Sequence, residues 1–330
     1  MTTPAEFMLR SGLQSAEESA TWTALTGGVS SDLWRVDLPG RSLCVKRALP
    51  TLRVGEKWQA PVTRNAVEYA WLTFAARHRR GNVPRLLAHD PEAGYFAMEF
   101  LPHPVWKTEL MAGRVDPAVA AAVGNVLGEL HRMSTRESGL ATEFANDANF
   151  AALRLEPYFT TAARRHPQVA RQLVALADRT AATHLALVHG DISPKNILVG
   201  RAGPVFLDAE CAVFGDPAFD LAFCLTHLAL KMLVRPDRAD DLRAAADSLL
   251  AAHASQIDWE SVAAFDHRVT TLVPALLLAR VDGASPVEYL TDVSRTAVRK
   301  VAIGMLLAPV SSTHRLFDRW RADIKVSHRC

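Results

Sequence analysis

The chain has little of several features that would narrow its class at once. It contains four cysteines, none of them in a C-x-x-C pair, so neither a zinc site nor a disulfide framework is indicated. We find no run of about 18 apolar residues. The opening residues carry no apolar segment of the signal-peptide kind. These absences predict a reduced, cytoplasmic protein with no membrane partner.

An excess of charge of one sign is also missing. The 330 residues hold 37 Lys and Arg against 35 Asp and Glu, a formal net charge of +2, so nucleic acid is not an expected partner. Residues 211–330 alone carry 14 acidic and 14 basic side chains. This balance argues against a carboxylate-rich pocket for a polycationic ligand.

Residues 187–210 hold the most informative pattern. An apolar run leads into His189-Gly190-Asp191, Asn196 follows five residues after Asp191, and a second apolar run ends at Asp208. In phosphoryl transfer, one carboxylate orients and deprotonates the attacking hydroxyl, while an amide oxygen and another carboxylate hold Mg2+ against the nucleotide phosphates. A hairpin with a merely polar loop is the alternative. The whole pattern favours a kinase-type site with Asp191 as general base and Asn196 and Asp208 as metal ligands.

Neighbouring polar residues receive supporting roles. We expect His189 to bond loop backbone near the second aspartate, and Asp220 to accept from the backbone N–H groups of residues 189–191, because a buried acid needs partners. Lys195 has two open interpretations, as a catalytic group that steadies the γ-phosphate or as a solvated side chain.

The first hundred residues differ in pattern from the rest. Three short apolar runs separated by turns, two later runs around a Pro-Gly-containing turn, and one amphipathic stretch predict an antiparallel sheet with one main helix. The predicted strands are Thr21–Leu25, Leu33–Leu38, Ser42–Arg47, Arg85–Ala88 and Tyr95–Phe100, and the predicted helix is Asn65–His78. We therefore expect a β-rich nucleotide-binding lobe over residues 1–101.

From about residue 102 the pattern is mostly helical. Asp116-Pro117 is typical of an N-cap followed by the first helical residue. Helices are predicted from there to Leu130 and over residues 160–184, 218–233, 237–256, 259–281, 286–308 and 312–326. The fold class is thus α+β, with a larger α-helical catalytic and substrate-binding lobe over residues 102–330.

Lys46 is the candidate for binding the α- and β-phosphates. A lysine in this kind of strand does so in kinases and pairs with a helix glutamate, here Glu68 rather than Glu56. A solvated edge lysine is the alternative. The turn at Gly27–Ser31 and the end of the last strand complete the predicted nucleotide site, through Gly28, Ser30 and Ser31 over the phosphates and the backbone near Glu99 and Leu101 at the adenine.

The quoted motifs carry a family resemblance over nearly the whole chain. Residues 189–196 resemble the HGD catalytic loop of the aminoglycoside phosphotransferase-like superfamily of small-molecule kinases, and residues 206–222 resemble its metal-binding segment and the helix after it. Residues 52–58, with Asp208-Ala209-Glu210, are similar to methylthioribose kinases, although Asn196 departs from that pattern. The resemblance implies a two-lobed, protein-kinase-like fold, ATP and Mg2+ as cofactors, and Glu210 as a ligand of a second metal.

The sequence says least about the site that binds the phosphate acceptor. The resemblance points to Arg280 and Asp282, at the end of an apolar helix, although a helix-end cation beside a turn aspartate is an equal alternative. His227 and Lys231, one turn apart, form a second candidate wall. Ser285 to Glu288 read as a capping box that opens the next helix.

A small-molecule hydroxyl compound is therefore the expected substrate. An aminoglycoside-type antibiotic as acceptor is one rival. A nucleotide-binding pseudokinase with a scaffolding role is the other, and the full set of candidate catalytic residues argues against it. The sequence leaves open whether the nucleotide is ATP or GTP, and whether the protein is a monomer or a homodimer.

Overall fold

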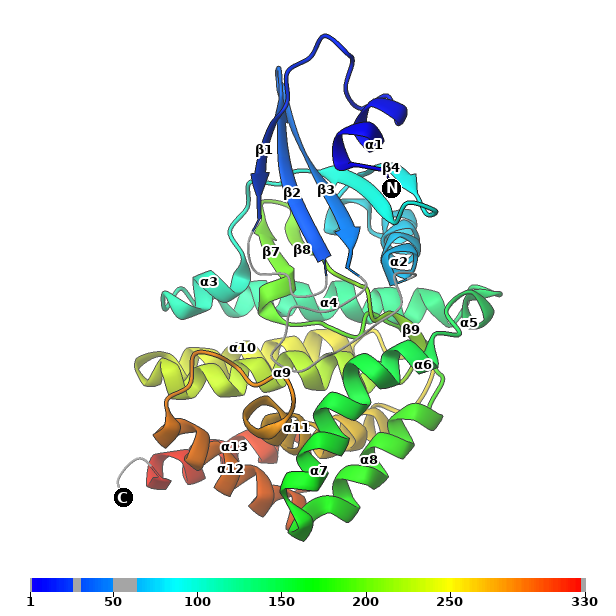
Figure 1. Ribbon diagram of the computed structural model, residues 1–330. Helices are drawn as coiled ribbons and strands as arrows, with labels where there is room; N and C mark the ends of the chain where they lie inside the picture. The colour runs from blue at the N-terminus through cyan, green and yellow to red at the C-terminus, as the bar shows by residue number, and fades with distance from the viewer. Residues whose placement is uncertain (1, 26–30, 50–63, 328–330) are drawn as a thin grey trace.

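The N-terminal part of the chain is built on one antiparallel sheet (Figure 1). The computed structural model describes residues 2–25, 31–49 and 64–327. The sheet has the order β1-β2-β3-β5-β4. Its strands are β1 (Thr21–Ala24), β2 (Ser31–Leu38), β3 (Arg41–Ala48), β4 (Leu86–Asp90) and β5 (Tyr95–Glu99). The predicted sheet is confirmed, and β3 lies at its centre.

Side chains alternate between the two faces along a strand, so both faces of the sheet carry apolar side chains. A helix covers each face. Helix α2 (Arg64–His78) packs Trp71 and Phe74 into the same core as Cys44 and Phe96. Helix α1 (Pro4–Arg10) covers the other face, where Phe7 stacks on Tyr95 with ring centroids 5.3 Å apart. Helix α1 was not among the predicted elements.

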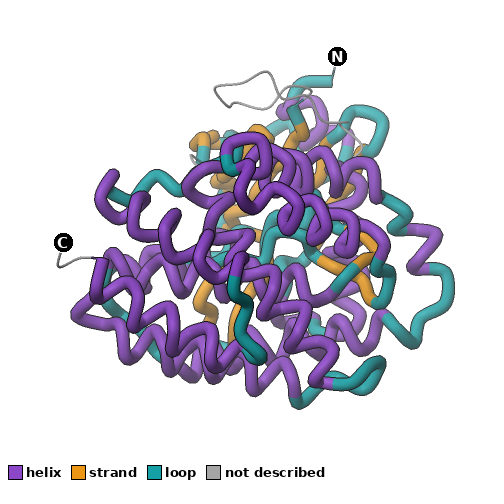
Figure 2. The backbone as a smooth tube through the Cα atoms, turned by 90° about the horizontal axis from the view of Figure 1, so that it is seen from below, coloured by secondary structure: helices purple, strands orange, loops and turns teal. Residues whose placement is uncertain are grey.

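Helices make up most of the rest of the chain (Figure 2). They are α3 (Trp106–Met111), α4 (Pro117–Ser134), α5 (Leu140–Glu143), α6 (Asp147–Phe150), the π-helical η2 (Ala151–Thr160), α7 (Thr161–Arg165), α8 (Ala170–Ala182), α9 (Pro217–Val234), α10 (Ala239–Ala254), α11 (Val262–Asp282), α12 (Asp292–Leu307) and α13 (Thr313–Ser327). The 3-10 turns are η1 (Arg80–Asn82), η3 (Pro167–Val169), η4 (Pro194–Asn196) and η5 (Pro236–Arg238). The expected N-cap of α4 is present, since Asp116 accepts from the backbone N–H of Ala118.

Two small β-hairpin-like pairs interrupt the helices. Strand β6 (Ala186–Val188) pairs with β9 (Val213–Gly215), and β7 (Ile197–Gly200) pairs with β8 (Gly203–Phe206), both antiparallel. In β7–β8, Ile197 lies opposite Phe206, which brings the chain before β7 beside the chain after β8. The two pairs therefore gather residues 189–196 and 207–212 at one place.

Two predicted helices are wrong at their boundaries. The expected helix over 160–184 is broken, because α7 ends at Arg165 and the turn at Pro167 precedes α8. The expected helix at 286 begins at Asp292, with Thr291 as its N-cap. Ser285 is not a cap, since its hydroxyl and carbonyl accept from the Arg280 guanidinium.

Helices α9 and α11 are apolar and long enough to cross a membrane by length and composition alone. In the fold, 94% of the α9 window and 61% of the α11 window are buried. Figure 1 shows both helices among the other helices of the lower half, so they are core elements here. Their burial leaves the few polar side chains that they carry in need of partners.

Candidate active site

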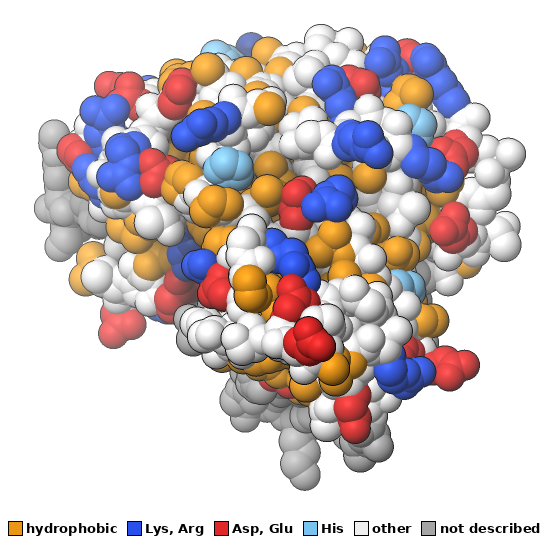
Figure 3. Space-filling model, turned by 90° about the horizontal axis from the view of Figure 1, so that it is seen from above, with side chains coloured by type: hydrophobic (Ala, Val, Ile, Leu, Met, Phe, Trp, Pro, Cys, Tyr) orange, Lys and Arg blue, Asp and Glu red, His pale blue; other side chains and the backbone are white. Residues whose placement is uncertain are grey.

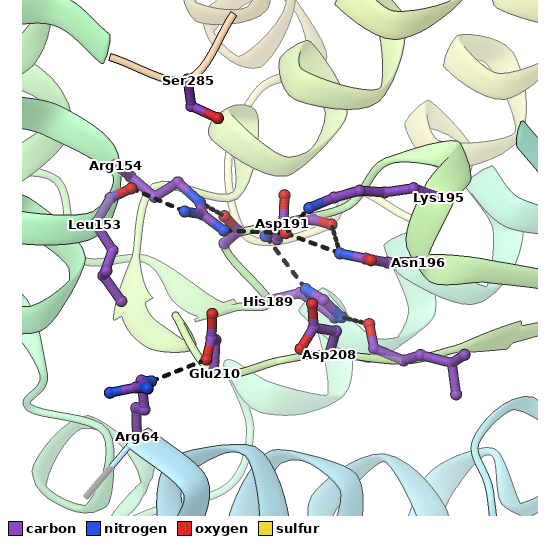
Figure 4. A network of polar contacts seen from close by, with 12 residues as sticks. Arg64, Leu153, Arg154, His189, Asp191, Lys195, Asn196, Asp208, Glu210 and Ser285 are labelled. Carbon is purple, nitrogen blue, oxygen red and sulfur yellow. Dashed lines mark hydrogen bonds and ion pairs between the residues drawn. The ribbon is translucent and has the colours of Figure 1, made fainter. Parts of the chain in front are cut away.

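The carboxyl group of Asp191 lies at the centre of the polar network in Figure 4. Asn196 Nδ2 donates to its Oδ2 at 2.8 Å, and Arg154 Nη2 and Lys195 Nζ each lie 3.0 Å from the same atom. No described residue donates to the other oxygen, Oδ1. One carboxylate oxygen is thus anchored by three donors, and the second is left as an acceptor.

The charges around Asp191 decide its protonation. Burial by itself would raise the pKa of Asp191, but the nearby cations of Arg154 and Lys195 outweigh burial and lower it below the ordinary value. Asp191 is therefore ionised at neutral pH. An ionised, anchored carboxylate can accept a hydrogen bond from a substrate hydroxyl and orient it.

Asp220 on α9 holds the loop that carries Asp191 in place. Its carboxyl oxygens accept from the backbone N–H groups of His189 at 2.7 Å and Gly190 at 2.8 Å, as the sequence predicted. His189 Nε2 lies 3.1 Å from the carbonyl oxygen of Leu207, which confirms the expected contact between the loop and the second hairpin strand. The loop is thereby tied to both α9 and β8.

Glycine is required within this loop. Gly190 has φ +79°, and a Cβ atom there would lie 2.7 Å from the backbone oxygen of Cys211. A side chain would thus be strained twice, by conformation and by contact.

Lys46 forms a buried ion-pair network with two acids. Its Nζ lies 2.6 Å from Glu68 Oε2 and 2.5 Å from Asp208 Oδ1. Because β3 is central, with Lys46 opposite Leu33 on β2 and Phe96 on β5, Lys46 is not an edge residue. The structure shows the expected pairing with Glu68, and the rival Glu56 lies outside the described residues.

Burial and charge act against each other in this network. Burial opposes the Lys46 charge, but the carboxylates of Asp208 and Glu68 outweigh it and raise the Lys46 pKa. The Lys46 ammonium likewise holds the pKa of Asp208 well below its usual range in spite of burial. Burial raises the pKa of Glu68 to about 7. Lys46 and Asp208 are therefore both charged at neutral pH.

The donor set next to Asp191 fits a hard divalent cation. Asn196 turns its amide nitrogen to Asp191, so its amide oxygen is available, and the carboxyl groups of Asp208 and Glu210 stand side by side in Figure 4. Asp208 has φ +69°, a costly conformation that clusters at functional sites. In the described ranges no three acidic, His or Cys side chains form a metal cluster. Mg2+ needs only a few protein ligands, because phosphates and waters complete its coordination shell.

Two arginines of the site were not assigned a role from the sequence. Arg154, in the π-helical segment η2, bonds the Gly190 carbonyl at 2.5 Å as well as Asp191. Arg64, at the start of α2, lies 3.1 Å from Glu210 through Nε. Arg64 had a sequence signal, since it stands one helical turn before Glu68. Arg154 had none, because only the fold brings η2 to the loop.

The other predicted nucleotide contacts are placed only in part. Gly28 and Ser30 lie outside the described residues, and Ser31 is buried at the start of β2. At the end of β5, the Glu99 N–H donates to the Arg85 carbonyl, and the Leu101 carbonyl accepts from His103 N–H.

The four acceptor candidates divide into two groups. Arg280, His227 and Lys231 are buried next to one another on α9 and the end of α11. Asp282 points into an ion pair instead: its carboxyl oxygens lie 2.6 and 2.8 Å from Arg299 nitrogens, and 2.7 Å from His166 Nε2. Asp282 is thus occupied by structural partners.

Comparison with known proteins agrees with this geometry. The model of the phosphotransferase enzyme family matches residues 21–286. The chain belongs to this family. It is similar to methylthioribose kinases: 27% identical over 228 residues to that of Escherichia coli O45:K1, covering 59% of this chain and 54% of the relative. That of Yersinia enterocolitica is 26% identical, covering 72% and 65%.

Solved structures share the fold. An amicoumacin kinase, solved with AMP-PNP and Ca2+, superposes with TM-score 0.57 at 13% identity and covers 90% of this chain and 91% of its own. A Plasmodium vivax ethanolamine kinase gives TM-score 0.57 at 11% identity, with coverage of 98% and 86%. The predicted kinase-like fold is confirmed. The chain spans about half the length of the first curated relatives that it matches.

Proposed function

We propose that the protein is an ATP-dependent phosphotransferase that moves the γ-phosphate of ATP directly to a hydroxyl group of a small metabolite. The observation that carries the proposal is the state of Asp191, an ionised carboxylate with one oxygen anchored by three donors and the other open. A general base needs this combination of fixed position and free acceptor.

Each side chain of the site then has a task. Asp191 Oδ1 accepts and orients the acceptor hydroxyl, and Arg154 holds that carboxylate in place. Lys46, fixed by Glu68, binds the α- and β-phosphates. Asp208 and Asn196 would hold Mg2+, which would neutralise charge at the phosphates. Lys195, half-exposed beside Asp191, orients the γ-phosphate.

The division of labour follows the fold. In this proposal residues 1–101 bind the nucleotide, and residues 102–330 provide the catalytic loop and the acceptor site. A scaffolding pseudokinase has no chemical need for a Lys46 that contacts Glu68 and Asp208, nor for an Asn196 that contacts Asp191. The methylthioribose kinases among the relatives make methylthioribose one acceptor to test, beside other sugars, amino alcohols, hydroxy acids and aminoglycosides.

The test is ADP release from MgATP across such a panel, with the wild type, Asp191→Asn and a control. Asp191→Asn should retain nucleotide binding and lose about 10^2- to 10^4-fold in kcat, because the amide cannot serve as a base. Asp178→Asn is the matched control, since Asp178 is exposed on α8. Full turnover by Asp191→Asn, or nucleotide binding with no acceptor-dependent ADP release, would contradict the proposal.

A further inference from the structure

A group of basic side chains meets on the α9 side of the active site. We call it the basic cluster: Lys107 of α3, His227 and Lys231 of α9, and Arg280 of α11. Tyr289 lies against it, with its ring centroid 5.6 Å from Lys107 Nζ and 5.2 Å from Lys231 Nζ. Three separate elements thus bring positive charge to one place.

Among the described residues, the charges of Lys231 and Arg280 have no ion-pair partner. Lys231 is 1% exposed, and its Nζ lies 3.5 Å from its only hydrogen-bond partner, the carbonyl oxygen of His227. Arg280 is buried too, and its partners are the neutral Tyr158 hydroxyl and the hydroxyl and carbonyl of Ser285. In the part of the chain that the structure describes, no carboxylate pairs with Lys231 or Arg280.

Glu288, the acid whose charge acts on Lys231, is already engaged. Glu288 forms an ion pair with Lys107 at the exposed edge of the cluster. Burial lowers the pKa of Lys231 to about 7, and the Lys107 charge adds to this effect. Burial also holds the pKa of His227 well below its usual range, with Arg280 and Lys231 acting in the same direction. All four groups would gain from a negative charge among them.

Three polar atoms of the cluster also lack hydrogen-bond partners among the described residues. They are His227 Nε2, Arg280 Nε and the Tyr289 hydroxyl oxygen. A buried polar group without a partner costs free energy, so such groups at one place indicate a ligand that completes them. Each can donate a hydrogen bond, and donors beside cations are the chemistry that holds carboxylate or phosphate oxygens.

The basic cluster adjoins the catalytic base. The Tyr158 ring lies 5.6 Å from the Arg280 guanidinium carbon and 5.9 Å from that of Arg154, which holds Asp191. Figure 4 shows Ser285, whose carbonyl binds Arg280, on the Arg154 side of Asp191. Lys195, in contact with Asp191, is close enough to act on the charge of His227. The Tyr158 ring therefore links the basic cluster to the arginine that holds Asp191.

We propose that the acceptor substrate carries a small anionic group, a carboxylate or a phosphate, which binds to Lys231, His227 and Arg280 while its hydroxyl faces Asp191. This inference rests on the proposed phosphotransferase function and narrows its substrate class. It disfavours polycationic antibiotics, which the uncompensated positive charge of the cluster would repel.

The test uses matched probes that differ only in charge. Binding of D-glycerate, glycerol 3-phosphate and glycerol, and of 4-hydroxybutyrate and 1,4-butanediol, is measured by titration calorimetry on the full chain with MgADP. An anionic member should bind about tenfold to hundredfold more tightly than its neutral counterpart. The carboxylate and phosphate arms separate the two anion types.

Variants locate the effect. Lys231→Met keeps the side-chain volume and should abolish the preference for the anion, while the neutral probes and MgADP bind as before. Lys300→Met, an exposed lysine on α12, is the matched control and should retain it. Tyr289→Phe keeps the ring beside Lys231, and should weaken the anions only; it provides a second test if Lys231→Met does not fold.

Two results would overturn the inference: no anion that binds more tightly than its neutral counterpart, or a preference that survives both Lys231→Met and Tyr289→Phe. The proposed kinase activity fails separately. It would be contradicted if anions bind more tightly in a way that depends on Lys231, but no anionic hydroxyl compound causes release of ADP.

Discussion

The phosphate side and the acceptor side of the site treat buried charge in opposite ways. On the phosphate side four cations (Lys46, Arg64, Arg154, Lys195) face four carboxylates (Glu68, Asp191, Asp208, Glu210). On the acceptor side, among the described residues, Lys107, Lys231 and Arg280 face one carboxylate, that of Glu288. The Tyr158 ring lies between one residue of each side, 5.9 Å from the guanidinium carbon of Arg154 and 5.6 Å from that of Arg280.

The difference shows where each side obtains its counter-charges. A buried ion that loses its partner is strongly destabilising, so a protein pairs it or leaves the partner to a ligand. The phosphate side is complete within the chain and is preorganised before nucleotide arrives. The acceptor side is incomplete, which is why we assign its missing negative charge to the substrate. On the face that Figure 3 shows, side chains of both signs are interspersed, whereas Lys231 and Arg280 are buried.

The same substitution on the two sides gives the sharpest contrast. Lys46→Met should lower the free energy of unfolding by roughly 3 kcal/mol, because Glu68 and Asp208 lose their shared cation. Lys231→Met should leave the free energy of unfolding unchanged or raise it, because the substitution removes a buried charge that has no counter-ion among the described residues. Urea denaturation of the nucleotide-free protein at pH 7 measures both, with Lys300→Met as control. Equal losses of unfolding free energy in Lys46→Met and Lys231→Met would contradict this difference between the two sides.

Removal of a phosphate-side acid should act through the metal. Asp208→Ala should weaken MgATP binding by about tenfold to hundredfold, the range of a lost charge-assisted contact, and should change binding of metal-free adenosine little. Calorimetric titrations with Mg2+ and with EDTA measure the two affinities. If both ligands lose affinity equally, Asp208 maintains the fold rather than the metal.

The pH dependence of stability reports on the acceptor side. With a folded pKa of about 7 against 10.5 for the free side chain, Lys231 releases a proton on folding between these pH values. The unfolded chain then binds more protons, so stability relative to Lys231→Met should rise with pH in this window, by at most about 1.4 kcal/mol per pH unit. Below pH 7 the destabilisation by the buried charge is complete.

Paired denaturation curves at pH 7, 8 and 9 for the wild type and Lys231→Met measure this difference. The groups that face Lys231 are the same in both proteins: Lys107 of α3, Glu288 and Tyr289 of the segment before α12, Arg280 of α11, and Cys224 and His227 of α9. A flat difference would mean that Lys231 keeps an ordinary pKa and has a counter-ion.

Glu210→Gln should have the smallest effect. The amide still offers an oxygen to Arg64, which lies 3.1 Å away, and Glu210 is at most the ligand of a second metal. We expect MgATP affinity to fall by about tenfold or less. A loss as large as that of Asp208→Ala would place Glu210 among the primary metal ligands.

Local patterns were good guides wherever neighbours in the sequence decide the structure. The antiparallel strands and the Asp116 cap follow from alternation and from side-chain capping, which act over a few residues. The same kind of signal was overlooked at α1, where Thr3 and Glu6 form a capping box with Pro4. At Ser285 a capping pattern was present and the fold overrode it, since Arg280 takes its oxygens.

By itself the sequence determined which residues could do the chemistry. The spacing of Asp191, Asn196 and Asp208, and the pairing of a strand lysine with Glu68, follow from what phosphoryl transfer requires, and the structure brings these residues together. Only the tertiary structure brought Arg154 to Asp191 and bound Asp282 to Arg299. It also left Lys231 without an ion-pair partner in the part of the chain that the structure describes. The physical reason is that a side chain's charge is written in the sequence, whereas its burial and its partner depend on elements far away along the chain.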